Sequence, residues 1–246
     1  MQVFRRQGRP VIYLDETWVN QYHTAAYRWT DHLPRKEIDN HRPMVDDAPL
    51  QPKITANRGQ RIIVLHAGFA KYGLLDNCEL VFQAKKADGD YHGEMNGTTF
   101  MDWFENTLMP NLGEPCVILM YNPSYHHVLV EKSRSPSSNS RTGDMVRWLQ
   151  YRAIPVSPSL TKPEVYKIVK SSKPQPIYKT NIFAEQNGHA VLRLPPRHCE
   201  LNPIQIIWGI VKGSVALENT FKLKDLKDVT KNGFSKVKLT CLPRPK

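Results

Sequence analysis

The chain has 246 residues, enough for one α/β domain with a sizeable core. Hydrophobic residues make up 40% of it and charged residues 23%, which is typical of a globular protein. No apolar run approaches the roughly 18 residues of a membrane helix, and the apolar stretch Val11–Leu14 is too short for a secretory signal. The composition argues against a membrane-spanning protein and favours an intracellular one.

Positive charge is the most informative bulk property. There are 34 Lys and Arg against 23 Asp and Glu, a net charge of +11. Residues 131–189 carry ten Lys and Arg against four acids, and residues 212–246 carry nine against three, whereas the first 130 residues are closer to balance. Such clustering favours a polyanionic partner, most simply nucleic acid, although many basic proteins bind none specifically.

The cysteines indicate no metal or disulfide framework. Cys78, Cys116, Cys199 and Cys241 form no C-x-x-C pair, so free thiols are expected. His198 and Cys199 resemble a metal-binding pair, but no second pair follows at zinc spacing. We therefore expect these two to be packing residues.

Strands are predicted in the first third of the chain. Val11–Leu14 is apolar and β-branched, and Thr17–Trp29 alternates loosely as an antiparallel continuation. Arg61–Ala70 predicts a buried strand and Cys78–Ala84 its partner across a turn. The stretch 30–60 is rich in Pro, Asp and Asn, which is typical of a long loop.

A helix is predicted to begin at Asn96. Thr98 and Thr99 supply capping hydroxyls, and apolar residues recur after them at helical spacing. Pro110 and Gly113 end the helix, since neither continues it well.

The middle of the chain predicts a central strand followed by a helical segment. Cys116–Met120 is the most strand-like run of the sequence. Thr142–Arg152 and Lys162–Ser171 each predict a short helix after a Ser-rich loop at 133–140, and Val191–Leu194 predicts a short strand.

A last clear helix is predicted to begin at Asn202. This residue is a favourable N-cap, Pro203 suits the first helical position, and Gln205 completes a capping box. Beyond Gly213 the pattern weakens, and residues 236–246 are expected to fray. The order of elements predicts an α/β fold, a mixed sheet flanked by helices.

Two acidic residues stand at the ends of predicted elements. Asp15 closes the first strand, where a buried carboxylate must be satisfied by a cation, a metal or hydrogen bonds. Glu200 lies two residues before the Asn202 cap, near the positive end of the helix. Taken singly, each also fits an ordinary role, Asp15 in a chain turn and Glu200 in helix-start electrostatics.

Three segments occur in the order found in one known family. They are YLDETWV (13–19), VILMYNPSYHH (117–127) and LPPRHCELNPIQIIWGIVK (194–212). Together they resemble the signature blocks of Tc1/mariner-like transposases, which carry a DDE superfamily endonuclease domain. The third block is the most specific, and the resemblance covers roughly residues 11–217.

The resemblance implies a fold, a reaction and a set of ligands. The fold would be RNase H-like, with a mixed five-stranded sheet between helices. The reaction would be Mg²⁺-dependent (or Mn²⁺-dependent) DNA cleavage and strand transfer, in which carboxylates hold two metal ions. Asp15 matches the first metal-binding acid and Glu200 the third. The second acid should stand just before Asn122, where this sequence has Tyr121.

Tyr121 is the main departure from the family pattern. A phenol has an ordinary pKa near 10, so it supplies no anionic ligand at neutral pH, and it is bulkier than a carboxylate. Asn122 should face the opposite side of the strand and cannot easily substitute. We therefore expect normal DDE catalysis to be abolished.

Residues next to these positions have plainer interpretations. Glu16 should point away from Asp15, as a surface group or a group behind the ligands. His126 and His127 could contact DNA or orient a ligand, but ordinary loop histidines are the simpler interpretation. Gln205 stands where the family usually has Glu, and it serves a helix cap as well.

The predicted domain organisation has three parts. Residues 1–10 form an N-terminal tail, 11–217 the RNase H-like domain and 218–246 a basic C-terminal tail. Tyr121 and Glu200 lie 79 positions apart, farther than in the best-known members, so a basic insertion at about 131–189 is expected, as in a long-spacer subgroup. The family's helix-turn-helix region is not expected in the ten residues before Val11, so neither is sequence-specific recognition of transposon ends.

Three hypotheses for function follow. The first is a transposase-derived domain that binds DNA but is catalytically impaired by Tyr121. The second is an active Mg²⁺-dependent endonuclease and strand transferase in DNA transposition. The third is a fragment without retained function. DNA is the expected partner, a homodimer is possible, no membrane is involved, and residence in the nucleus is expected from the DNA-related fold and the basic charge.

Overall fold

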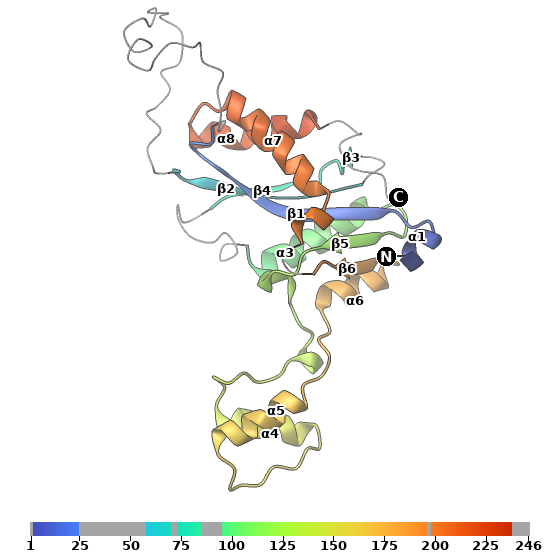
Figure 1. The fold of residues 1–246 in the computed structure, drawn as a ribbon, viewed down its shortest axis with the longest axis vertical. Coiled ribbons are helices and arrows are strands. Elements are labelled where there is room, and N and C mark those ends of the chain that lie inside the picture. The colour runs from blue at the N-terminus through green and yellow to red at the C-terminus, as the bar shows by residue number, and fades with distance from the viewer. Residues whose placement is uncertain (1, 25–57, 70–72, 85–94, 196–197, 238–246) are drawn as a thin grey trace, which may run out of the picture.

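The computed structural model describes residues 2–24, 58–69, 73–84, 95–195 and 198–237. Its main helices and strands follow in chain order (Figure 1). They are α1 (Gln2–Arg6), β1 (Val11–Asn20), β2 (Arg61–Phe69), β3 (Gly73–Leu74), β4 (Leu80–Gln83), α3 (Gly97–Trp103), β5 (Val117–Met120), α4 (Thr142–Tyr151), α5 (Lys162–Ser171), α6 (Lys179–Gln186), β6 (Ala190–Arg193), α7 (Ile204–Glu218) and α8 (Leu223–Ser235).

A mixed sheet forms the centre of the molecule. Within the described residues it has six strands in the order β3-β2-β1-β5-β6, and β4 also pairs with β2. β2 runs antiparallel to β1 from Ile12 to Asn20, whereas β5 pairs in parallel with Val11–Tyr13 only. The predicted α/β fold with a mixed sheet flanked by helices is thus confirmed, with six strands where five were expected.

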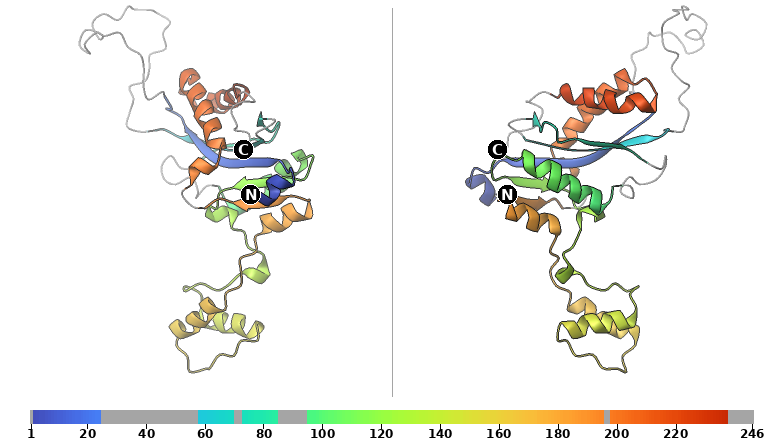
Figure 2. Two further views of the ribbon diagram at one scale, coloured as in Figure 1. Left: turned by 45° about the vertical axis from the view of Figure 1, so that its right-hand side comes forward. Right: turned by 180° about the vertical axis from the view of Figure 1, so that it is seen from behind.

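The two faces of the sheet are covered by different helices (Figure 2). Side chains alternate along a strand, so Ile12 and Leu14 pack with the core around α3, whereas Val11 and Tyr13 pack with the core around α7 and α8. Each fully buried large apolar side chain contributes about 1.5–3 kcal/mol to stability. This alternation decides which face each polar residue further along β1 will meet.

The insertion predicted at about 131–189 divides into two parts. Helix α6 packs against β6 and belongs to the sheet domain. Residues 131–176, here called the two-helix unit, contain α4 and α5 and project away from the sheet (Figures 1 and 2). The chain segments that lead to and from the unit run side by side, joined by the bridge between Leu129 and Tyr178.

The unit has a core of its own. Met145 and Leu149 of α4 pack with Val165 and Val169 of α5, and all four are buried. Both helices agree with the prediction from their apolar spacing, Lys162–Ser171 to the residue.

The first strand differs from the prediction in its length. Val11–Leu14 and the residues after Thr17 form one strand, β1, that runs to Asn20, so Asp15 lies inside a strand and does not close it. The full-length pairing with β2 explains the continuity. Residues 25–29 of the predicted continuation, and most of the predicted loop at 30–60, lie outside the described residues.

Helix boundaries also differ in places. Asn96, not Thr98 or Thr99, caps α3, since its Oδ1 accepts a hydrogen bond from the Thr99 backbone N–H at 2.9 Å. Beyond Trp103 the helix continues as a π-helical turn, Phe104–Leu108, and a 3₁₀ turn that contains Pro110. Three helices were missed, since α1, α6 and α8 lie in segments that were assigned to tails or to the insertion.

Helix α8 gives the predicted C-terminal tail a structural role. Its Leu226 is fully buried against the α7 side of the sheet, and Gly233 faces Val211 of α7. A Cβ at Gly233 would lie 3.2 Å from a Val211 methyl group, tighter than most real contacts. The glycine therefore permits the close crossing of α7 and α8, a signal that apolar spacing alone does not reveal.

The cysteine and membrane predictions can be compared with the described residues. Cys78 and Cys116 are buried free thiols, as expected, and burial raises the pKa of each to about 12. Among the described helices, none is long and apolar enough to cross a bilayer.

Candidate catalytic cleft at the open edge of β1

A cleft opens where β1 runs on past its parallel partner. β5 pairs with β1 only as far as Tyr13, so beyond that residue the β5-facing edge of β1 has no paired strand among the described residues. The cleft has a volume of about 410 Å³. Its lining comes from β1, from the segment after β5 and from α7, namely Asp15, Glu16, Thr17, Trp18, Tyr121, Asn122, Pro123, Tyr125, Gln205 and Lys212.

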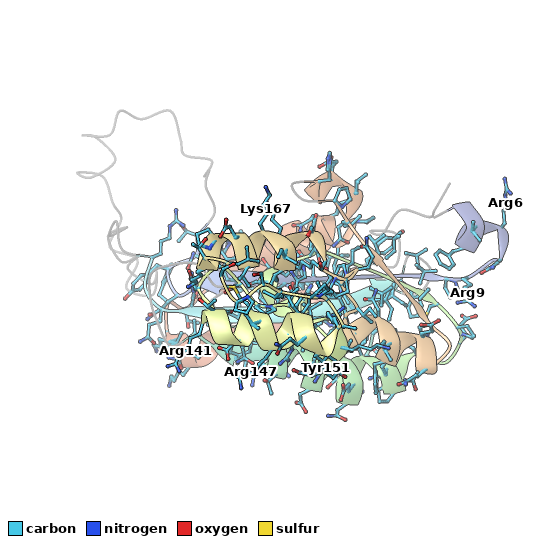
Figure 3. All side chains as sticks on the ribbon, turned by 90° about the horizontal axis from the view of Figure 1, so that it is seen from below. Arg6, Arg9, Arg141, Arg147, Tyr151 and Lys167 are labelled. Atoms are coloured by element: carbon cyan, nitrogen blue, oxygen red, sulfur yellow. The ribbon has the colours of Figure 1, made fainter. Side chains whose placement is uncertain are left out.

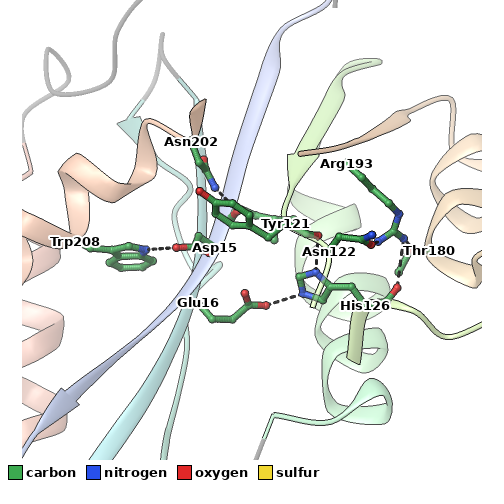
Figure 4. A network of polar contacts seen from close by, with 10 residues as sticks. Asp15, Glu16, Tyr121, Asn122, His126, Thr180, Arg193, Asn202 and Trp208 are labelled. Atoms are coloured by element: carbon green, nitrogen blue, oxygen red, sulfur yellow. Dashed lines mark hydrogen bonds and ion pairs between the residues drawn. The ribbon is translucent and has the colours of Figure 1, made fainter. Parts of the chain in front are cut away.

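Asp15 is buried on the α7 side of the sheet, with 5% of its surface exposed. Its Oδ2 accepts a hydrogen bond from Trp208 Nε1 at 3.1 Å (Figure 4) and another from Gln205 Nε2 at 2.6 Å. Burial is the largest influence on its acidity and, with the neighbouring Glu16 carboxylate, raises the pKa of Asp15 well above its ordinary value, whereas the hydrogen bonds lower it. The site thus makes ionisation of this carboxyl unfavourable.

The polar residues at the start of α7 bond to β1 and do not form the predicted capping box. The helix begins at Ile204 without a side-chain cap, so the prediction of Asn202 as its capping residue is wrong. Asn202 Nδ2 instead donates to the Leu14 carbonyl on the open edge of β1 at 3.1 Å. Gln205, predicted as the second half of the capping box, donates to Asp15. Both side chains donate to oxygen atoms of β1, so neither caps the helix.

Tyr121 follows β5 and lines the same cleft as Asp15. Its hydroxyl donates to the His198 carbonyl at 3.3 Å, and its ring packs against the apolar core on the α7 side of the sheet. The position that the family pattern assigns to a carboxylate thus holds an aromatic ring on the same face as Asp15. The family resemblance implied that position 121 faces the same site as Asp15.

Glu200 lies apart from the cleft lining. It sits in the 3₁₀ turn Cys199–Leu201, with 63% of its side chain exposed, and its Oε1 pairs with His198 Nδ1 at 2.7 Å. The hydrogen bond from His198 lowers the pKa of Glu200. Asp15 and Tyr121 are therefore brought into one cleft, and Glu200 is not among the described residues that line it.

On the other face of β1, Glu16 forms a buried pair with His126. The carboxylate Oε1 lies 2.8 Å from His126 Nε2, and His126 Nδ1 lies 3.0 Å from the Tyr121 carbonyl oxygen. Glu16 points away from Asp15, as predicted, but it is buried and not a surface group. His126, interpreted as an ordinary loop histidine, is fully buried with its ring centroid 3.9 Å from that of Phe100.

Arg193 of β6 fixes the segment that follows β5 by hydrogen bonds. Its guanidinium donates to Asn122 Oδ1 at 3.0 Å, to Thr180 Oγ1 at 2.8 Å and to the His126 carbonyl at 3.3 Å (Figure 4). It also lies over the Tyr178 ring, 4.1 Å from the centroid, and burial lowers its pKa. Asn122 thus faces away from Tyr121, as predicted.

Arg193 was not predicted from the sequence as part of the site. The only signal was an arginine at the end of the short apolar strand AVLR. A buried arginine requires partners, and here they come from segments up to 71 positions away. Its role became visible only with the fold.

No protein-family model matches the sequence, and no curated protein matches it. Solved structures do match by fold. A pre-cleavage Mos1 transpososome aligns with a TM-score of 0.52 at 11% identity, and a Mos1 transposase paired-end complex with left transposon end with 0.50 at 10%. A Mos1 mariner paired-end complex with Mn aligns with 0.50 at 11%. Each alignment covers 98% of this chain and 53% of the other.

The chain has a mariner transposase-like fold, which is RNase H-like. It spans about half the length of the Mos1 transposase chains that it matches. In this fold the open edge of β1, the end of β5 and the start of α7 converge on the cleft that holds Asp15 and Tyr121. The turn with Glu200 lies beside it, since the Tyr121 hydroxyl donates to the His198 carbonyl, but Glu200 itself is not in the lining.

The mariner transposase-like fold does not by itself supply a metal centre here. Among the described residues, no group of three or more His, Cys, Asp or Glu side chains is placed to hold an ion. The two carboxylates of the cleft are engaged, Asp15 with Trp208 and Gln205, and Glu16 with His126. In this arrangement the two carboxylates do not fit as ligands of a two-metal centre. Metal binding by Asp15 and Glu200 stays a prediction.

Proposed function

We propose that this chain is a transposase-derived DDE domain that binds DNA and whose two-metal cleavage chemistry is impaired. The observation that carries the proposal is Tyr121, which lies in the cleft with Asp15 at the position where the family pattern has its second carboxylate. The ring packs on the core and its hydroxyl is bound to a backbone carbonyl, so it occupies this space as a structural element.

Two observations support the proposal that DNA is the partner of this chain. The matched structures are a transpososome and paired-end complexes of Mos1 transposase, one of them with a left transposon end. This chain also carries a net charge of +11, which suits a polyanion. The proposal includes residence in the nucleus, and imaging of a tagged chain tests that part.

The impairment follows from the ligands that Mg²⁺ needs. Two-metal cleavage requires several anionic oxygens around a pair of ions about 4 Å apart. Asp15 Oδ2 already accepts two hydrogen bonds from α7, and Glu200 is paired with His198 outside the cleft lining. A neutral phenol at position 121 removes one more anionic oxygen.

The test is nicking of supercoiled plasmid DNA in the presence of Mg²⁺ or Mn²⁺. We expect the natural chain to give no metal-dependent nicking above buffer. Tyr121→Asp should raise nicking by more than about tenfold, since a factor of ten needs only about 1.4 kcal/mol of transition-state stabilisation. Adding Asp15→Ala to Tyr121→Asp should abolish the gain.

Tyr121→Phe is the matched control. It keeps the ring and removes only the hydroxyl that donates to His198, so it should remain inactive. Nicking by the natural chain that disappears in Asp15→Ala would establish the active endonuclease instead. Failure of the natural chain to bind DNA even at low salt would leave the fragment without retained function.

A further inference from the structure

The two-helix unit (residues 131–176) is the most basic part of the chain that folds around its own core. It contains nine Lys and Arg against three acids, a net charge of +6. Its apolar residues pack between α4 and α5, so the charged residues stand on a rigid support outside the sheet domain. A rigid support matters because a side chain on a folded helix loses less freedom on binding than one on a loop.

The outer face of α5 carries lysines that no acidic partner neutralises. Lys167 and Lys170 are three positions apart, on the helix side opposite the buried Val165 and Val169. Lys162, the first residue of α5, and Lys173, just beyond its end, are also exposed. Among the described residues, no carboxylate lies within ion-pair distance of any of the four lysines.

The one acid of α5 is engaged elsewhere. Glu164 Oε2 accepts hydrogen bonds from the Thr161 backbone N–H at 2.8 Å and from its hydroxyl at 2.6 Å. This capping box turns the carboxylate toward the helix start. The net charge of the α5 face therefore stays positive.

The outer face of α4 differs, although it belongs to the same unit. Arg147 is paired with Asp144 one turn earlier, and Arg152 lies over the Trp148 ring, 4.4 Å from its centroid. Figure 3 shows Arg147 and Tyr151 along α4, with Lys167 on the opposite side of the unit along α5. The two faces can therefore be tested separately.

We propose that the outer face of α5 docks on the phosphate backbone of duplex DNA. This inference rests on the proposed DNA-binding function and assigns it a surface away from the cleft. From Lys167 to Lys170 the helix rises about 4.5 Å at 1.5 Å per residue. One DNA strand carries a charge every 3.4 Å or so along the axis, so Lys167 and Lys170 match about two neighbouring phosphates.

The test compares two charge-reversal variants of the full chain. One is Lys167→Glu with Lys170→Glu, and the matched control is Arg141→Glu with Arg147→Glu on the α4 side, which changes the net charge equally. The probe is a short fluorescent duplex of mixed sequence, and its dissociation constant is measured over a series of salt concentrations. Circular dichroism of each variant checks that the unit stays folded, since all four positions are exposed.

Loss of two phosphate contacts has a defined signature. The slope of log affinity against log salt should fall in magnitude by about 1.8 in the α5 variant, at roughly 0.9 per contact. The dissociation constant should rise about tenfold, whereas the α4 variant should keep the slope of the natural chain. Equal losses in both variants would overturn the inference, because they would show unspecific attraction by the net charge.

Two other outcomes separate the inference from the function it rests on. If the natural chain binds DNA and the α5 reversal leaves the slope unchanged, DNA docks elsewhere and only the inference fails. If the natural chain binds no DNA at low salt, the proposed function fails with it. An α5 effect seen with single-stranded RNA but not with duplex DNA would also overturn the inference.

Discussion

The cleft beside β1 and the two-helix unit both depend on charged side chains, but they hold them in opposite ways. Asp15 is buried in the cleft and is bonded to residues of α7 that follow it by about 190 positions. Lys167 and Lys170 are exposed on a unit of 46 residues whose core comes from two neighbouring helices. The cleft is therefore a product of long-range contacts, and the lysine face is a product of local ones.

This difference determines how the charged groups of each region affect the free energy of unfolding. A carboxyl group that is removed from water destabilises the protein unless hydrogen bonds compensate. Exposed lysines cost almost nothing and remain available to a partner. Changes in the cleft should therefore act on the stability of the whole domain, whereas changes in the unit should act locally.

The largest expected effect is Leu149→Ala in the core of the unit. Leu149 is fully buried, and truncation of such a residue typically costs about 2–5 kcal/mol. Because α4 and α5 pack mainly on each other, the loss should stay within the unit. Native-state hydrogen exchange should show faster exchange of α4 and α5 amides and unchanged protection in β1 and β5.

The matched variant in the sheet is Ile118→Ala. Ile118 is fully buried in β5, beside β1, so its truncation should lower protection throughout the sheet domain. If Leu149→Ala also lowered the protection of β1 and β5, the two-helix unit would not be stabilised independently of the sheet domain.

The next effect is the pH dependence of stability caused by Asp15. Because burial and Glu16 raise its pKa in the folded protein above the ordinary 3.8, the folded state binds this proton more tightly than the unfolded state. The contribution of Asp15 to stability is therefore greatest below about pH 3.8 and is lost as the pH rises toward the folded-state pKa. The loss amounts to at most about 1.4 kcal/mol per pH unit.

Asp15→Asn removes this titration and keeps an oxygen that can accept from Trp208 and Gln205. Urea unfolding at a series of pH values should show the variant gaining stability over the natural chain as the pH rises above 4 or so. A stability difference that does not change with pH would contradict the raised pKa of Asp15.

The smallest effect belongs to an exposed ion pair of the unit. Arg147→Ala breaks the pair with Asp144 on the surface of α4, where such pairs contribute about 0.3–0.5 kcal/mol. A double-mutant cycle with Asp144→Ala measures the coupling by urea unfolding. A coupling above about 1 kcal/mol would place this pair among the stronger interactions that are expected only in the cleft.

Local patterns predicted most of the elements. The apolar spacing of α5 and the β-branched run of β5 were sufficient because those residues report on their own neighbours. Helix α8 was missed although Leu223, Leu226 and Val229 recur at helical spacing and pack on the α7 side of the sheet. The contact with Val211 shows why Gly233 stands on the same face.

The candidate site was predictable in part. The family resemblance grouped Tyr121 with Asp15, and both line one cleft. Strand alternation predicted that Asn122 faces the other way, where its Oδ1 accepts from Arg193. It could not reveal that Glu16 and His126 are a buried pair, because these two residues are 110 positions apart.

By itself, the sequence determined most of the strands and helices, the basic character of the predicted insertion at about 131–189 and the presence of a tyrosine where the second carboxylate was expected. Only the tertiary structure decided that Asn202 and Gln205 serve β1 and not their own helix. It alone also decided that the lysines of α5 stand on a separate core. The reason is physical: propensity and alternation act between near neighbours, whereas burial and hydrogen-bond partners depend on which distant segments the fold brings together.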